Sequence, residues 1–155
     1  MEDHHDEAAP EPRALLPLAF AVVRNSGGQV LLVRRAEGGY WELPGGRVEI
    51  GESASATVVR KVAEQAGIAI DVTGLAGVYS DPAQVSVCPQ GRRSYQLFAV
   101  CSHASTAARE ARPDPRETTA AAWFDPGRLA QLDMHPAMRQ RLTDALLEPQ
   151  RAHFD

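Results

Sequence analysis

The chain of 155 residues is 44% hydrophobic and 23% charged, which suits one globular domain with a proper core. Its net charge of -4 offers no basic surface for nucleic acid and no anchor for an acidic membrane, and no apolar run approaches the roughly 20 residues that span a bilayer. Cys88 and Cys101 are the only cysteines, too few for a disulfide framework, so two reduced thiols in the cytoplasm are the simplest interpretation.

The first 17 residues are predicted to be a disordered acidic tail, because they contain three prolines and little to bury. Their acidic composition differs from the basic-then-apolar pattern of a signal peptide. His4 and His5 could chelate a metal with the flanking acids, although solvated side chains explain them as well. We place the folded domain at residues 18–148 and a C-terminal tail at 149–155.

Residues 18–24 and 30–35 are two apolar runs rich in β-branched side chains, and a glycine-containing turn separates them. This pattern predicts a β-hairpin. Successive residues of both runs are apolar, so we expect the sheet to be covered on both faces. The following segment, 36–51, contains several glycines and Pro44 and is predicted to be a loop.

The best helix in the chain is predicted for residues 53–66, since Ser53 can cap its start and Gly67 stands where a left-handed terminator belongs. At about 100° per residue, the apolar side chains gather on one side, which we expect to pack on the sheet. That side comprises Val58, Val59, Val62, Ala63 and Ala66. The opposite, polar side comprises Arg60, Lys61, Glu64 and Gln65.

Strands and helices alternate in the second half of the chain. Residues 68–80 are strand-like, with Gly74 and Gly77 as expected bulges, and strands are also predicted at 94–101 and 120–124 around a polar loop at 104–119. Asp125-Pro126 begins a helical turn, and the last helix runs from His135-Pro136 to about Leu147. Strands flanked by helices predict an α/β architecture, with helices on both faces of one sheet.

Residues 45–68 read GGRVEIGESASATVVRKVAEQAGI. This segment resembles the Nudix box, in which Gly, five residues, Glu and seven residues precede Arg-Glu-aliphatic-x-Glu-Glu-x-Gly-aliphatic. Seven of the nine specified positions match at the correct spacing: Gly46, Glu52, Arg60, Val62, Glu64, Gly67 and Ile68. At the two others, Lys61 and Gln65 stand where the family has glutamate. So many matches across a gapped pattern make the resemblance specific.

The flanking sequence extends the resemblance. WELPGG at 41–46 is similar to the family's lead-in to the box, and AWFDP at 122–126 is similar to its closing strand, so the resemblance covers about residues 18–147. It implies the Nudix α/β/α sandwich with a mixed central sheet. It also implies a hydrolase that cleaves the diphosphate bond of a nucleoside diphosphate linked to another moiety, with Mg²⁺ or Mn²⁺ as cofactor. The implied partner is a small molecule, and a homodimer is possible.

The resemblance also implies roles for particular residues. The metal ligands would be Glu52, Glu64 and Glu117, and the catalytic residues Arg60, Glu64 and Glu117. The cofactor- and ligand-binding residues would be Gly45, Gly46, Lys61 and Gln65. In the family the arginine orients the glutamates by a salt bridge, and the carbonyl of the residue matching Gly45 is a further metal ligand. Glu117, six residues before Trp123, could equally be a solvated loop acid.

Lys61 and Gln65 predict a weakened metal site. Residues three and four apart on a helix converge on one spot, where the family has three glutamates and this chain has Lys61, Glu64 and Gln65. The lysine repels a cation and can pair with Glu64, while the glutamine can still offer a carbonyl oxygen. Two functions follow as hypotheses. The protein is a slow hydrolase, or it is a catalytically silent domain that binds a nucleotide diphosphate as a sensor or interaction module. A third hypothesis is a scaffolding domain whose cleft is vestigial.

Several other side chains have two interpretations. Tyr40, Trp41 and Tyr79 could stack on a nucleobase, although aromatic residues beside a sheet more often belong to the core. Glu42 and Glu49 could be recruited to the metal site or simply be exposed. His103 and His135 lack a partner pattern and are expected to be structural.

Overall fold

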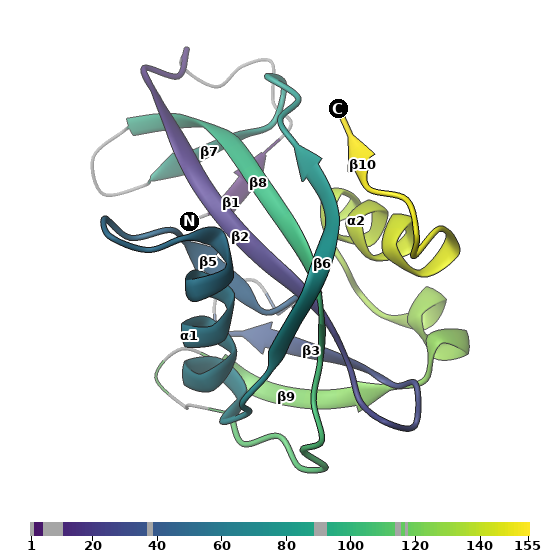
Figure 1. Cartoon of the computed structure of the whole chain (residues 1–155). Helices are drawn as coiled ribbons and strands as arrows, with labels where there is room; N and C mark the ends of the chain where they lie inside the picture. The colour runs from purple at the N-terminus through teal and green to yellow at the C-terminus, as the bar shows by residue number, and fades with distance from the viewer. Residues whose placement is uncertain (1, 5–10, 37–38, 89–92, 114–115, 117) are drawn as a thin grey trace.

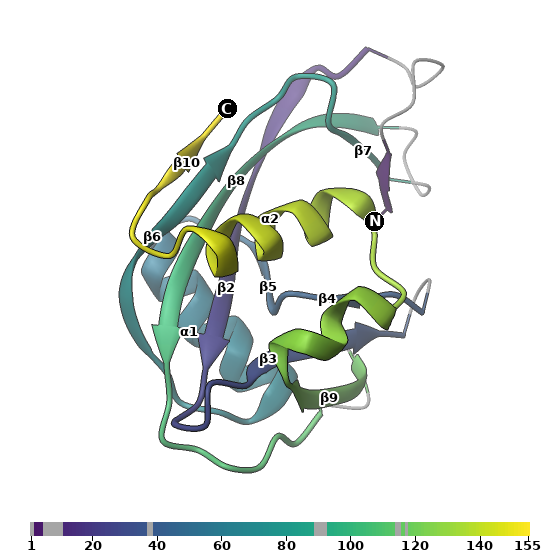
Figure 2. The ribbon, with the colours of Figure 1, turned by 90° about the vertical axis from the view of Figure 1, so that its right-hand side faces the viewer.

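A mixed sheet lies between helices in the computed structural model, with α1 on one face and α2 on the other (Figures 1 and 2). The structure describes residues 2–4, 11–36, 39–88, 93–113, 116 and 118–155. The helical elements are α1 (Ala54–Ala66), the 3-10 helix η1 (Pro126–Gln131) and α2 (Pro136–Leu147). The strands are β1 (Glu2–His4), β2 (Ala14–Arg24), β3 (Val30–Arg35), β4 (Trp41–Glu42), β5 (Gly45–Arg47), β6 (Asp71–Tyr79), β7 (Val85–Cys88), β8 (Arg93–Ser105), β9 (Thr118–Phe124) and β10 (His153–Phe154).

The centre of the sheet is the parallel pair β2 and β8, aligned from Ala14 beside Tyr95 to Arg24 beside Ser105. The sequence predicted that this strand begins at residue 18. It begins at Ala14 instead, because residues 14–17 continue the ladder with β8. Pro17 fits there because its carbonyl accepts from the Val48 N–H. A residue's N–H and C=O point to the same side of a strand, so the missing donor of Pro17 faces away from β8.

Two apolar cores lie on opposite faces of the sheet, as the continuous apolar runs predicted. Alternate residues of β2 supply both of them because side chains alternate along a strand. Leu16, Leu18, Phe20 and Val22 belong to the core beneath α2. Ala19, Ala21 and Val23 belong to the core beneath α1. Burying each of the larger aliphatic side chains contributes roughly 1.5–3 kcal/mol.

The ends of α1 agree with the sequence prediction, but its rotation about its axis does not. The Ser53 side chain accepts from the Ala56 N–H, and Gly67 ends the helix in the left-handed conformation at φ 67°. Val59, predicted to be buried, is 42% exposed, whereas Gln65, predicted to lie on the polar side, is fully buried. The buried residues are Thr57, Val58, Val62, Gln65 and Ala66, and Ala63 is exposed.

The remaining elements largely follow the predictions. The register between β6 and β8 shifts beside Gly74 and Gly77, which confirms the expected bulges. η1 and α2 begin at the predicted Asp-Pro and His-Pro pairs. Three strands were not predicted in the middle of the chain: β4 and β5 lie inside the expected loop 36–51, and β7 pairs with the start of β8. Among the described residues, no helix is long and apolar enough to cross a membrane.

Candidate functional site

The loop before α1 lies directly against the central strand. β5 pairs with β2, bringing Gly45 opposite Phe20 and Gly46 opposite Ala19. A Cβ atom on Gly45 would lie 2.1 Å from the carbonyl oxygen of Ala19 and 2.7 Å from the Cα of Phe20. Because those atoms belong to the backbone of a central strand, they cannot move aside. Glycine at this position therefore sets the distance between the loop and the sheet.

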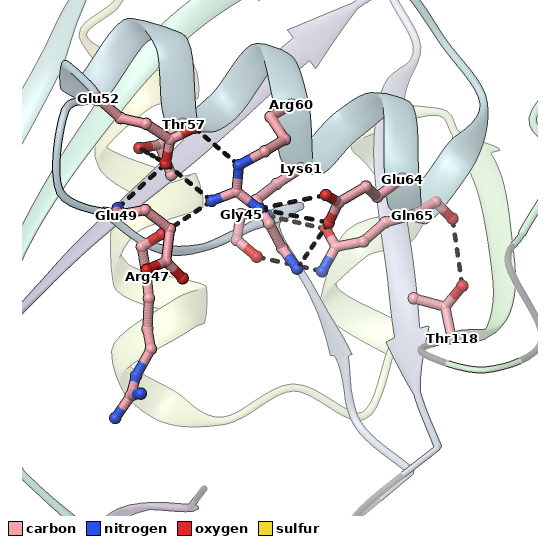
Figure 3. A network of polar contacts seen from close by, with 10 residues as sticks. All are labelled: Gly45, Arg47, Glu49, Glu52, Thr57, Arg60, Lys61, Glu64, Gln65 and Thr118. Carbon is pink, nitrogen blue, oxygen red and sulfur yellow. Dashed lines mark hydrogen bonds and ion pairs between the residues drawn. The ribbon is translucent and has the colours of Figure 1, made fainter.

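Gln65 binds the same loop through its amide (Figure 3). Its Oε1 accepts from the Gly45 N–H at 3.0 Å, and its Nε2 donates to the Gly45 carbonyl at 3.1 Å. Both hydrogen bonds are buried, and an amide makes both because it has a donor and an acceptor on one planar group. An ionised glutamate could accept from the N–H but could not donate to the carbonyl. Gln65 thus donates to the carbonyl that the family resemblance assigned to a metal.

Lys61 lies over the second glycine of the loop. A Cβ on Gly46 would lie 2.9 Å from the lysine Cε and 3.6 Å from its Nζ. The lysine side chain is only 12% exposed, and its Nζ donates to Glu64 Oε2 at 3.3 Å. Since the aliphatic stem packs on Gly46 and the ammonium is held at the loop, the positive charge belongs to the site rather than to solvent.

Glu52 and Arg60 join the loop to the helix. Arg60 Nε donates to Glu52 Oε2 at 2.7 Å, and Arg60 Nη2 donates to Glu52 Oε1 at 2.9 Å and to the Arg47 carbonyl at 3.2 Å. Glu52 Oε1 also accepts from the Glu49 N–H and the Thr57 hydroxyl. The hydrogen bond from Arg60 is the main cause that lowers the pKa of Glu52 to about 2, and the same bond raises the pKa of Arg60. Both oxygens of Glu52 are thus engaged in hydrogen bonds, one of them with the loop and both with α1.

Glu64 is the more exposed of the two glutamates that pair with Arg60, with a side chain 42% exposed against 19% for Glu52. Arg60 Nη1 donates to its two oxygens at 3.3 and 3.4 Å, and Lys61 donates to one of them. Arg60 therefore bridges Glu52 and Glu64, as the resemblance implied for the family's arginine. Glu64 contacts two cations, and Glu52 contacts one.

The described residues do not fit the Mg²⁺ ion that the family implies. Magnesium takes hard oxygen ligands in octahedral geometry and prefers carboxylates. Among the residues that the structure describes, no group of three or more histidine, cysteine or acidic side chains is placed to hold a metal ion. A divalent ion about 4 Å from the Lys61 ammonium would meet a repulsion of several kcal/mol at an effective dielectric near 20. Glu117, the third predicted ligand, lies outside the described residues.

The acidic residues that could have been recruited from outside the box are engaged or exposed. Glu42 pairs with Arg35 Nε at 2.5 Å on β4 and β3. The Glu49 side chain is exposed, and its backbone N–H donates to Glu52.

The predicted aromatic and histidine residues are mainly structural. Trp41 packs edge-on against Phe124, with ring centroids 4.9 Å apart, and Tyr79 lies against the same core and donates to Asp144 at 2.9 Å. Tyr40 is 47% exposed. His103 Nδ1 lies 3.0 Å from an Arg24 nitrogen, and His135 Nδ1 accepts from the Ala137 N–H at the start of α2. Of the three aromatic residues, Tyr40 is the most accessible to a ligand.

Two threonines support the site without having been predicted. The Thr57 hydroxyl donates to Glu52, and the buried Thr118 hydroxyl donates to the Gln65 carbonyl at 3.2 Å. The second bond satisfies a carbonyl in the last turn of α1, where helical partners are missing. The contact of Thr57 with Glu52 could have been found from the sequence, because the two residues are only five positions apart and Thr57 lies on the helix of the box. Thr118 is 53 residues from Gln65, so only the fold brings them together.

Comparison with known proteins identifies the family. The NUDIX domain model matches residues 15–145, and the chain therefore belongs to the NUDIX family. A putative 8-oxo-dGTP diphosphatase of Bacillus subtilis is 35% identical over 126 residues, which cover 81% of this chain and 76% of that protein. A MutT-like protein of Streptomyces ambofaciens is 34% identical over 140 residues, covering 90% and 82% respectively.

Solved structures support the same fold. The MutT protein of Methanosarcina mazei superposes with a TM-score of 0.70 at 24% identity, covering 89% of this chain and 97% of that one. The NUDIX domain of Shewanella oneidensis NrtR, solved in complex with ADP ribose, superposes with a TM-score of 0.69 at 22% identity and covers 94% of both chains. The predicted mixed-sheet α/β/α sandwich is confirmed.

Proposed function

We propose that this protein binds a nucleoside diphosphate linked to another moiety at the loop–helix site, and that it hydrolyses the diphosphate bond slowly. Two relatives in Bacillus subtilis support this ligand class, since one is a putative 8-oxo-dGTP diphosphatase and the other, 32% identical over 149 residues, is a putative ADP-ribose pyrophosphatase. The observation that carries the proposal is the retained box frame, in which Arg60 ties Glu52 and Glu64 to the loop while Lys61 and Gln65 replace two acids.

Hydrolysis requires a base for the attacking water. The water oxygen bonds to one phosphorus, the bridging phosphorus–oxygen bond breaks, and the water proton passes to a carboxylate. Glu64 is our candidate for that base among the described residues, because it is the more exposed of the two glutamates that pair with Arg60. Its oxygens already accept from Arg60 and Lys61, so a water molecule must compete for them. Slow turnover follows, and Glu117 remains a second candidate base.

A catalytically silent binding domain is the second candidate function. It is favoured by the amide of Gln65, which holds both the N–H and the carbonyl of Gly45. With that pair in place, the loop is positioned without a metal ion, and Lys61 can neutralise phosphate without activating water. Such a domain would serve as a sensor or interaction module for the nucleotide.

The test is product release from ADP-ribose and 8-oxo-dGTP, measured with Mg²⁺ or Mn²⁺ and with a chelator, for the wild type and for Lys61→Glu/Gln65→Glu. We expect weak release by the wild type and faster, metal-dependent release by the double variant. Undetectable release by the wild type would favour the silent binding domain. Rapid, metal-dependent turnover by the wild type would contradict the slow-hydrolase proposal. A homodimer and a cytoplasmic location stay predictions, which light scattering and cell fractionation test.

A further inference from the structure

Lys61 stands at a position of the box where the family has glutamate, and its ammonium lies beside the glycine loop. Its stem crosses Gly46, with Cε 2.9 Å and Nζ 3.6 Å from the position of a Cβ on that glycine. The side chain is 12% exposed, in contrast to the 74% of an ordinary surface arginine such as Arg151. The ammonium is therefore presented beside the glycine loop by packing, and it is not a mobile surface charge.

The carbonyl expected to complete a metal site is already bonded. Gln65 Nε2 donates to the Gly45 carbonyl at 3.1 Å, and Gln65 Oε1 accepts from the Gly45 N–H at 3.0 Å. Figure 3 shows the amide and the Lys61 side chain approaching the same glycine loop from adjacent turns of α1. The two substitutions therefore act together, because one satisfies the loop backbone and the other supplies positive charge.

Glu64 can release Lys61 without losing its own charge balance. Arg60 donates to both Glu64 oxygens, and it also holds Glu52 through two hydrogen bonds. When the Lys61 ammonium turns from Glu64 to a phosphate oxygen, Glu64 keeps Arg60 as its partner. Lysine binds phosphate as a point charge, so a small movement of its end suffices.

We propose that the loop–helix site binds the diphosphate group of its ligand through the Lys61 ammonium, without a divalent cation. This inference rests on the proposed function, because it takes a nucleoside diphosphate derivative as the ligand. A divalent cation then competes with Lys61 for the same phosphate oxygens. Binding is therefore independent of Mg²⁺ or weakened by it, in contrast to a site built on three glutamates, where the ion is required to offset the charge.

The experiment is isothermal titration calorimetry of the full chain with ADP-ribose and, separately, with 8-oxo-dGTP, in a chelator and in Mg²⁺, with AMP as the ligand that lacks a diphosphate. Lys61→Met removes the charge and keeps a stem that packs on Gly46, while Lys61→Arg keeps the charge. Arg151→Met is the matched control, since it removes one exposed positive charge far along the chain from the loop. Thermal unfolding by circular dichroism checks that every variant is folded.

We expect the wild type to bind ADP-ribose in chelator at least as tightly as in Mg²⁺. Lys61→Met should weaken binding of ADP-ribose roughly tenfold or more, the loss of one hydrogen bond to a charged group, with a smaller effect on AMP. Lys61→Arg should retain most of the affinity, and Arg151→Met should match the wild type. Binding by the wild type that requires Mg²⁺ would overturn this inference and leave the proposed function standing. Absence of ADP-ribose and 8-oxo-dGTP binding in both conditions would overturn both.

Discussion

Replacing Gln65 with glutamate tests how the loop is held. The amide is fully buried and makes two hydrogen bonds to Gly45. A carboxylate keeps the bond from the Gly45 N–H but places an oxygen against the Gly45 carbonyl, which loses its donor. An unsatisfied buried carbonyl costs about 1–3 kcal/mol, and burying the new negative charge adds to this cost. The positive charge of Lys61, one helical turn earlier, offsets part of it. We expect a net loss of roughly 2–4 kcal/mol in the free energy of unfolding.

The assay is thermal unfolding in chelator at neutral pH, with Gln150→Glu as the control because it makes the same charge change at an exposed position. For a chain of this size about 1 kcal/mol corresponds to roughly 2–4 °C, so Gln65→Glu should lower Tm by roughly 5–15 °C. The control should stay within about 2 °C of the wild type. An unchanged Tm for Gln65→Glu would refute the assignment of the amide as the element that holds Gly45.

The pH dependence of this variant gives a second check. In the folded state, burial raises the pKa of the carboxyl introduced at position 65 above its value in the unfolded chain. The folded variant therefore binds more protons than the unfolded variant as the pH falls, and its stability rises. A protonated carboxyl can donate to the Gly45 carbonyl as the amide does. The Tm difference from the wild type should therefore be largest near neutral pH and should shrink as the pH falls toward about 4.5. A difference that grows on acidification would contradict the geometry.

Three further predictions address other parts of the site. Gly45→Ala should destabilise the protein by several kcal/mol or prevent folding, because its Cβ would lie 2.1 Å from a backbone carbonyl of β2; a Tm near that of the wild type would contradict the close packing. Glu52 has a folded pKa lowered to about 2 by Arg60, so its stabilising contribution is complete above about pH 4.5 and is lost as the pH falls toward 2. Glu52→Gln should flatten that part of the stability profile in acid titrations followed by fluorescence. Val62→Ala should cost roughly 2 kcal/mol in chemical denaturation and Val59→Ala less than about 0.5, since the first is fully buried and the second 42% exposed; equal losses would refute the observed rotation of α1.

The sequence by itself determined the features that depend on neighbouring residues. Ser53 and Gly67 predicted the ends of α1, because capping bonds connect residues three or four apart. The unbroken apolar runs of β2 and β3 predicted a sheet covered on both faces, and Gly74 and Gly77 predicted the bulges of β6. The spacing of the box identified the family, since that spacing is itself a property of one loop and one helix.

Only the tertiary structure decided what Lys61 and Gln65 do. Periodicity placed both on the polar side of the helix, yet Gln65 is fully buried and Lys61 nearly so. The face that a helix buries depends on the surface against which it packs, and here that surface is formed by β5 together with β2. Two glycines without side chains leave room for a long amide and a lysine stem between β5 and α1. The partner is 20 residues from Gln65, so helical periodicity, which compares residues a few positions apart, cannot reveal it.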